Sequence, residues 1–145
     1  MRKGSVSSYI VVASAAAILT FAVSSNIRPS EAQPAAAPPA QLLTQPLADL
    51  PGREVRMSLL DRPPQASSPP HRHPGHHTFG YVLEGTYEFA VDGGAPKTLK
   101  AGEVFYEPPG AVHSVSRNPS QDQRTKIVVF MVADQKNPST VAEKP

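Results

Sequence analysis

The sequence predicts an all-β domain, and three features of its residues support that fold class. Prolines recur through the centre of the chain, at positions 51, 63, 64, 69, 70, 74, 96, 108, 109 and 119, and an interior proline costs a helix about 3 kcal/mol or more. Apolar and polar residues alternate in several segments, and glycine-containing turn signals separate these segments. We therefore expect about seven to nine short strands, arranged as a sandwich or a small closed barrel, with no substantial helix in the domain.

The N-terminal residues 1–32 have the features of a signal peptide or a membrane anchor. Arg2 and Lys3 make a basic start, and an uncharged apolar run follows from Tyr9 to Val23. A run of about fifteen apolar residues is short for a membrane span, which needs roughly 20, and matches the apolar region of a secretory signal better. We expect an exported protein, periplasmic or secreted, and an uncleaved N-terminal anchor is the alternative.

The next residues, 33–46, are rich in proline and alanine and are predicted to form a linker. Residues 134–145 are polar and contain two prolines, so we expect a flexible tail. The domain would then span residues 47–133, which is small but long enough for a core of its own. The segment 42–60 could cover an edge of its own sheet or cross to a second subunit.

The strand signals follow one another through this domain. In "EVRMSLLD" (54–61), Val55, Met57 and Leu59 alternate with polar residues, as in a half-buried strand. "FGYVLEG" and "TYEFAVDGG" (79–94) are rich in aromatic and β-branched residues, and Asp-Gly-Gly at their end is a hairpin signal. "KIVVFMVA" (126–133) is apolar on both faces, which is typical of an interior strand.

Charge and cysteine content exclude several functions. The formal net charge is +2, and residues 1–32 alone carry Arg2, Lys3 and Arg28 against Glu31, so the rest of the chain is close to neutral. That distribution leaves no basic patch for a nucleic acid. The chain contains no cysteine, which excludes disulfides and thiolate metal sites.

Histidines are concentrated in one place. Four of the five lie in "HRHPGHH" (71–77), and the fifth is His113. His71 and His73 would share one face of an extended segment, about 6.6 Å apart, and neutral imidazole is a good ligand for Zn, Cu, Fe and Ni. His113, after a Pro-Pro-Gly turn, could supply a third nitrogen from a neighbouring strand. A surface accident and a disordered metal-scavenging tract are the alternatives.

Two longer segments, "HRHPGHHTFGYVLEGTYEF" (71–89) and "GEVFYEPPGAVHSVSRN" (102–118), resemble the two motifs of the cupin superfamily. His71, His73 and Gly85 match the first motif, and the second is matched at Gly102, Pro108, Gly110 and His113. The resemblance implies a double-stranded β-helix, or jelly-roll, barrel that holds a divalent metal ion (Fe, Mn, Ni, Cu or Zn) at His71, His73 and His113. It also favours a homodimer.

The chain departs from the family motifs at three positions. The opening glycine of the first motif falls at Gln65, and the asparagine of the second falls one residue late, at Asn118. Thr78 stands where the family has a metal-binding glutamate. His77 is adjacent and could substitute, but neighbours on a strand point to opposite faces, so His77 and Thr78 cannot both face the metal without a bulge.

A site of three neutral imidazoles and no carboxylate would carry the full charge of the ion, about +2, and would favour hydroxide or an anionic substrate. On this argument the chain resembles the three-histidine cupin dioxygenases. We expect an oxidoreductase, dioxygenase-like, that acts on a small anionic or enolisable compound. Glu103 and Glu107 flank the second motif, and the sequence assigns neither a catalytic role. The alternatives are a non-catalytic metal or small-ligand binding module and a metal-free structural barrel.

Overall fold

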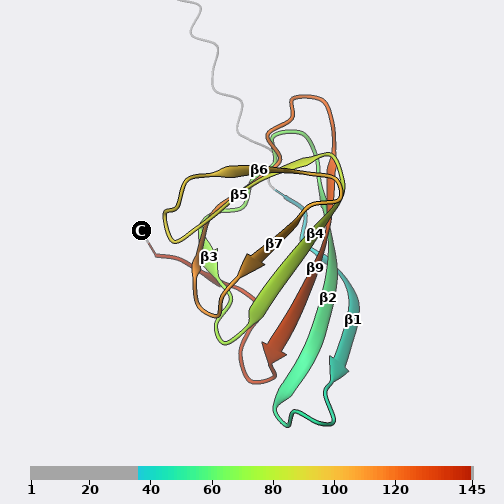
Figure 1. The fold of residues 1–145 in the computed structure, drawn as a ribbon, viewed down its shortest axis with the longest axis vertical. Coiled ribbons are helices and arrows are strands. Elements are labelled where there is room, and N and C mark those ends of the chain that lie inside the picture. Colours follow the sequence, from blue (N-terminus) through green and yellow to red (C-terminus); the bar gives the residue numbers. More distant parts are fainter. Residues whose placement is uncertain (1–35, 145) are drawn as a thin grey trace, which may run out of the picture. The chain divides into compact units, whose positions relative to one another are not determined.

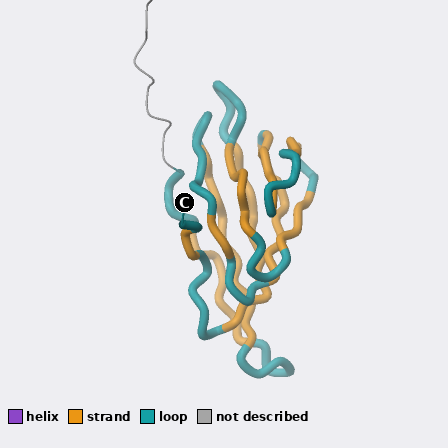
Figure 2. The backbone as a smooth tube through the Cα atoms, turned by 90° about the vertical axis from the view of Figure 1, so that its left-hand side faces the viewer, coloured by secondary structure: helices purple, strands orange, loops and turns teal. Residues whose placement is uncertain are grey.

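A computed structural model describes residues 36–144 (Figure 1), and the predicted signal peptide or anchor, residues 1–32, lies outside this range. The strands are β1 (Ala40–Pro46), β2 (Arg53–Arg62), β3 (His71–Arg72), β4 (His77–Glu84), β5 (Thr86–Val91), β6 (Lys97–Lys100), β7 (Val104–Glu107), β8 (Val112–Arg117), β9 (Thr125–Asp134) and β10 (Val141–Ala142). Residues 36–144 contain no helix, and so none that could cross a membrane (Figure 2). The all-β prediction is therefore confirmed for this part of the chain.

The strands form two antiparallel sheets of five strands each. The first sheet has the order β1-β2-β9-β4-β7, and the second has the order β10-β3-β8-β5-β6. Strand β9 lies between β2 and β4 and pairs with β2 along its whole length. The apolar run at residues 127–133 lies in this central strand, and its alternate residues from Ile127 to Ala133 face the core.

The core lies between the two sheets. Alternate residues of β9 point inward, and they pack with residues of β4, β5 and β7. The buried apolar cluster is Val82, Tyr87, Phe89, Phe105, Ile127, Val129, Met131 and Ala133. A β-carbon placed on Gly80 would lie 2.0 Å from the ring of Phe105, so the absence of a side chain at this position makes room for an aromatic ring of the core.

Two strands lie where the sequence predicts irregular chain. Strand β1 occupies residues 40–46 of the predicted linker, and β10 lies within the predicted tail. Both are held mainly through the backbone: every residue of β1 is exposed, and β10 pairs only with β3. Backbone pairing of this kind leaves no apolar pattern in the sequence, which is why composition alone suggested a linker and a tail. Within one chain, β1 pairs with β2 and forms an edge of the first sheet.

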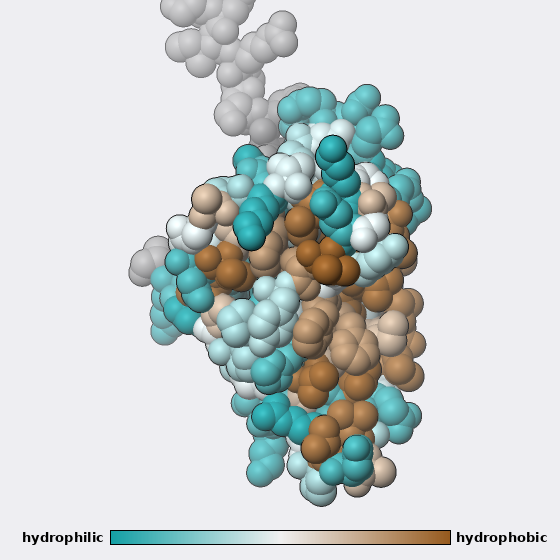
Figure 3. All heavy atoms as spheres, viewed as in Figure 1, coloured by the Kyte–Doolittle hydropathy of each residue, from teal (hydrophilic) through white to brown (hydrophobic). Residues whose placement is uncertain are grey.

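The outer face of the first sheet is also apolar. Phe79, Tyr81 and Leu83 of β4, with Val104 and Tyr106 of β7, are exposed large apolar residues. Figure 3 shows apolar side chains gathered on the face that carries β4, β7 and β9. Strand alternation explains the pattern, because the neighbours of these residues along each strand point into the core.

Candidate metal centre

A cavity of about 470 Å³ lies between the two sheets. Residues of both sheets line it, and the three histidines of the predicted site are among them. Most of the surface that the cavity exposes is apolar, although residues with polar side chains are the more numerous in its lining. A mainly apolar surface with polar groups among it is typical of a small-molecule site.

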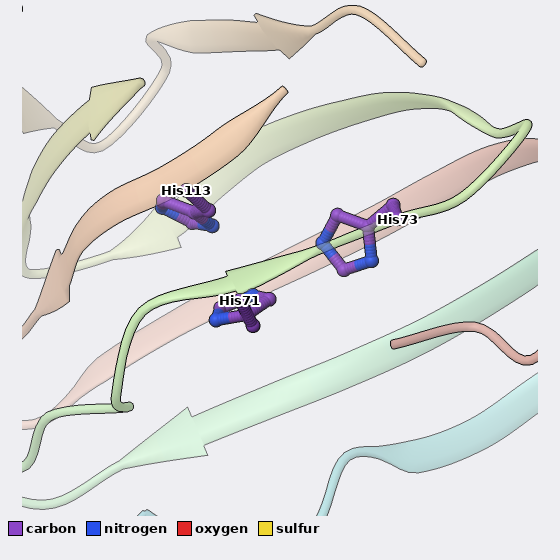
Figure 4. A group of neighbouring side chains, drawn as sticks. All are labelled: His71, His73 and His113. Carbon is purple, nitrogen blue, oxygen red and sulfur yellow. The ribbon is translucent and has the colours of Figure 1, made fainter. Parts of the chain in front are cut away.

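The sheet register brings the three histidines together. His71 of β3 lies directly opposite His113 of β8, and His73 follows two residues after His71. The ring centroid of His71 is 5.0 Å from that of His73 and 4.9 Å from that of His113. One nitrogen of each residue can be chosen so that all three atoms lie within 4.8 Å of one another (Figure 4). The three side chains could therefore hold one metal ion.

Backbone carbonyls orient two of the rings. His71 Nδ1 lies 2.8 Å from the carbonyl oxygen of Pro69, and His73 Nδ1 lies 2.5 Å from that of Ser139. A carbonyl oxygen only accepts, so each Nδ1 carries the proton and each Nε2 keeps its lone pair. This is the usual arrangement around a metal-ligating histidine. Ser139 belongs to the predicted tail, which thus helps to build the site.

A carboxylate lies beside the histidines, contrary to the sequence-based expectation that the site has none. Glu107 Oε1 is 3.3 Å from His113 Nδ1, and its Oε2 is 3.6 Å from His73 Nε2. Glu107 belongs to β7, and its register partner on β4 is Thr78. Glu107 therefore lies directly across the ladder from the position at which the family motif has its glutamate. An ionised Glu107 at this place would offset part of the charge of an ion held by the three imidazoles.

Burial controls the protonation of this group. It lowers the pKa of His113 to about 3 and that of His73 to about 4, and it raises the pKa of Glu107 to about 8. The pKa of His71 is also lowered, chiefly by burial. Without a metal the imidazoles and the carboxyl group are thus mainly neutral at pH 7, and their contacts are not ion pairs. Neutral imidazoles are ready to bind a cation.

The comparison with known families identifies the fold. A family model described as "Cupin domain" matches residues 58–131, which include His71, His73, His113 and Glu107. The chain belongs to the cupin family.

Relatives of this cupin include a plant protein and several solved structures. Germin-like protein subfamily 2 member 2 of Arabidopsis thaliana is 40% identical over 68 residues, which are 44% of this chain and 31% of that protein. Recombinant oxalate oxidase in complex with glycolate has 27% identity and a TM-score of 0.54, over 61% of this chain and 45% of the other. The cupin thus matches less than half the length of either relative.

An uncharacterized conserved protein with a double-stranded beta-helix domain from Klebsiella pneumoniae matches more of the chain. It has 22% identity and a TM-score of 0.60, and the match covers 87% of this cupin and 98% of that chain. At this level of identity the likeness concerns the fold.

The donor atoms of the cupin site fit a divalent cation. Besides two nitrogens of Arg62, three buried side-chain atoms of residues that line the cavity lack a hydrogen-bond partner: Thr78 Oγ1, Glu107 Oε2 and His113 Nδ1. A buried polar atom without a partner costs on the order of 1 to 3 kcal/mol. A cation bound among the imidazoles and the carboxylate would offset part of that cost, and three histidines with one carboxylate suit the metals Zn, Fe, Mn, Ni and Cu.

The structure does not bring His77 to this group. Its side chain is exposed on the outer face of β4, and its Nδ1 lies 2.9 Å from the hydroxyl of Tyr106. Thr78 takes the inward position, as strand alternation requires. His76, the remaining histidine, is fully buried away from the group: its Nδ1 accepts from the backbone N–H of Asp134, and its Nε2 lies 2.9 Å from the carbonyl oxygen of Pro138. His76 therefore anchors the segment that follows β9.

The departures from the cupin motifs are accommodated by the backbone and by side-chain hydrogen bonds. Gln65, at the position of the motif's opening glycine, has a φ of 61°, a left-handed conformation that glycine adopts most easily. Asn118 is fully buried, and its Nδ2 donates to the carbonyl oxygens of Pro63 and Gln123 at 3.0 and 2.7 Å. Asn118 thus ties the end of β8 to the chain after β2.

Proposed function

We propose that this cupin binds one divalent metal ion through His71, His73, His113 and Glu107, and acts as a dioxygenase-like oxidoreductase on a small anionic compound. The observation that carries the proposal is the convergence of three imidazoles, those of His73 and His113 buried and that of His71 partly buried, and one buried carboxyl group on one cavity. The likeness to an oxalate oxidase in complex with glycolate supports a small carboxylate as the substrate class.

A divalent ion at this position supplies Lewis acidity and, where the metal is redox-active, electron transfer. The chain's own residues set the charge around it. Glu107 loses its proton when a cation binds, because the cation favours the ionised carboxylate. The ion and one carboxylate together carry about +1, which still attracts an anion into a cavity with apolar walls.

The competing function is a non-catalytic metal or small-ligand binding module. One observation favours it: among the described residues that line the cavity, Glu107 is the only carboxyl group. If Glu107 is a metal ligand, no second carboxylate is present to act as a general base. A reaction at this site would then have to proceed without a carboxylate as general base, or the cavity would bind a metal or small ligand without catalysis.

Two measurements test the proposal. Elemental analysis of the purified protein should find about one metal ion per chain, and His71→Ala and His113→Ala should each abolish it. The matched control is His77→Ala, which removes an imidazole from the outer face and should leave the metal content unchanged. Equal metal content in the wild type and the His71 and His113 variants would contradict the metal site.

Measurement of oxygen consumption then distinguishes a dioxygenase-like enzyme from a non-catalytic binding module. The metal-loaded protein is incubated with oxalate, glycolate and enolisable acids, and turnover should depend on metal and on His113. A protein that holds about one metal ion and binds an anion, yet consumes no oxygen with any redox-active metal, would be the binding module.

We also propose that the protein is exported and forms a homodimer. The apolar N-terminal run supports export, and immunoblotting of periplasmic, medium and cytoplasmic fractions tests it. Light scattering tests the dimer, and a mass equal to one chain at micromolar concentration would contradict it.

A further inference from the structure

Arg62, the last residue of β2, is a buried cation without an ion pair. Its side chain lines the cavity, and the residue is only 4% exposed. The salt bridges among residues 36–144 do not include it. The neighbouring acidic residue, Asp61, pairs instead with Arg124 at the surface. An unpaired charge in a protein interior is costly, so buried arginines are normally matched by an anion.

The guanidinium is held in place by neutral groups. Its Nη2 donates to the hydroxyls of Ser68 and Ser116, each at 3.0 Å. Its Nε and Nη1 are buried and have no hydrogen-bond partner. A guanidinium has five N–H donors, so the two serines use the donors of Nη2 and leave three without a partner. The carbon Cζ lies 5.8 Å from the centre of the Tyr87 ring, a cation–π contact that fixes the group further.

Tyr87 does not act as the counter-ion. Burial raises its pKa to about 12, so its hydroxyl is neutral at physiological pH. The hydroxyl instead links the arginine to the histidines: it lies 2.7 Å from Ser116 Oγ and 3.3 Å from His113 Nε2. Three consecutive hydrogen bonds thus run from the guanidinium to the metal-centre histidine, and the residues at both ends line the same cavity.

We propose that Arg62 is the specificity-determining residue of the cavity and binds a carboxylate of the substrate through Nε and Nη1. The inference rests on the proposed function and narrows its substrate class. A ligand that satisfies both ends has one carboxylate for Arg62 and a second oxygen donor for the metal. Small dicarboxylates, 2-hydroxy acids and 2-oxo acids meet this requirement, whereas neutral enolisable compounds do not.

Malonate is a suitable probe, because it carries two carboxylates, and malonamide is its neutral counterpart. Calorimetric titrations use the Co(II)-loaded protein, with the metal content measured in every sample. Arg62→Met should weaken malonate binding about 10- to 100-fold, the effect of losing charge-assisted hydrogen bonds, and should keep about one Co(II) per chain. The matched control is Arg117→Met, which removes an exposed guanidinium paired with Glu88 on the same sheet as Ser116, and its malonate affinity should stay within about twofold.

The outcomes separate the inference from the proposed function. Equal malonate affinity in Arg62→Met and the wild type, with Co(II) bound to both, would overturn the role of Arg62 and leave the metal site intact. Failure of the wild type to bind Co(II), with malonate binding still dependent on Arg62, would overturn the metal site alone. If Arg62→Met does not fold, the inference is tested on the wild type by comparing malonate with malonamide. Equal affinity for the two ligands would overturn it.

Discussion

Replacement of Glu107 by glutamine tests the substitute carboxylate of the metal centre. Glu107 contacts His73 and His113 at 3.6 and 3.3 Å, so its distance from an ion held by these rings is taken as about 4 Å. At an effective dielectric constant of 20, a carboxylate and a divalent ion at that distance attract by about 8 kcal/mol, which is an upper bound because the ion gives up water to bind the carboxylate. Ionising a carboxyl group of pKa about 8 at pH 7 costs about 1.4 kcal/mol. Even if hydration of the ion cancels more than half of the difference, the about 2.7 kcal/mol that remains corresponds to roughly a 100-fold loss of metal affinity in Glu107→Gln.

The assay is competition with a chromogenic chelator for Co(II) at pH 7, together with calorimetry in buffers of different ionisation enthalpy. The wild type should release about one proton per ion, because Glu107 is mainly protonated without metal, and Glu107→Gln should release none. Glu103→Gln is the matched control, since Glu103 is exposed on the turn before β7. Unchanged affinity in Glu107→Gln, with no proton released by the wild type, would refute the reasoning.

A double variant that moves the carboxylate from position 107 to position 78 tests the same claim by restoring metal affinity. Thr78 and Glu107 are register partners with buried side chains, so the double variant Thr78→Glu/Glu107→Thr moves the carboxylate across the ladder to the position used by the family motif. We expect the double variant to recover most of the affinity that Glu107→Gln loses. An affinity as low as that of the single variant would show that position 78 cannot serve the metal in this chain.

Two further predictions concern stability. Because the pKa values of His73 and His113 are lower in the folded protein, the unfolded chain binds protons first as the pH falls, and the metal-free protein should lose stability from about pH 6.5 towards 3. The pKa of Glu107 is raised in the folded protein, so its contribution to stability should be lost as the pH rises from about 4.5 to 8. The unfolding free energy measured with urea should therefore be highest at about pH 6.5. In Glu107→Gln it should not fall on the alkaline side, and a fall identical to that of the wild type would contradict the raised pKa of Glu107. Gly80→Ala should cost about 1 to 3 kcal/mol of unfolding free energy, because the added carbon would lie 2.0 Å from the Phe105 ring; an unchanged urea midpoint would show that the ring has room to move.

Strand alternation and turn residues were enough to predict the all-β fold and the segments near the site. The alternating segment 54–61 lies within β2, and the predicted interior strand 126–133 lies within β9. The spacing of His71 and His73 placed both side chains near His113, because an extended backbone repeats every two residues. Strands β1 and β10 escaped prediction, since they are held mainly by backbone hydrogen bonds that any composition can make.

The sequence assigned no role at the site to two charged residues that line the cavity, Glu107 and Arg62, for different reasons. Glu107 was overlooked because the search for a carboxylate followed one motif along the chain, whereas the structure supplies it across the ladder. A signal was present: Glu107 lies two residues after Phe105, and strand alternation sends both to the same face. Arg62 follows the alternating segment 54–61 and gave no such signal, because an arginine beside Asp61 and two prolines is typical of a solvated turn.

The most direct test of the central claim is a crystal structure of the metal-loaded protein with anomalous data collected at the absorption edge of the bound metal. The account predicts one anomalous peak per chain, bonded to one nitrogen each of His71, His73 and His113 and to an oxygen of Glu107. A peak without Glu107 among its ligands, or no peak between the two sheets in a protein that retains its metal, would contradict it.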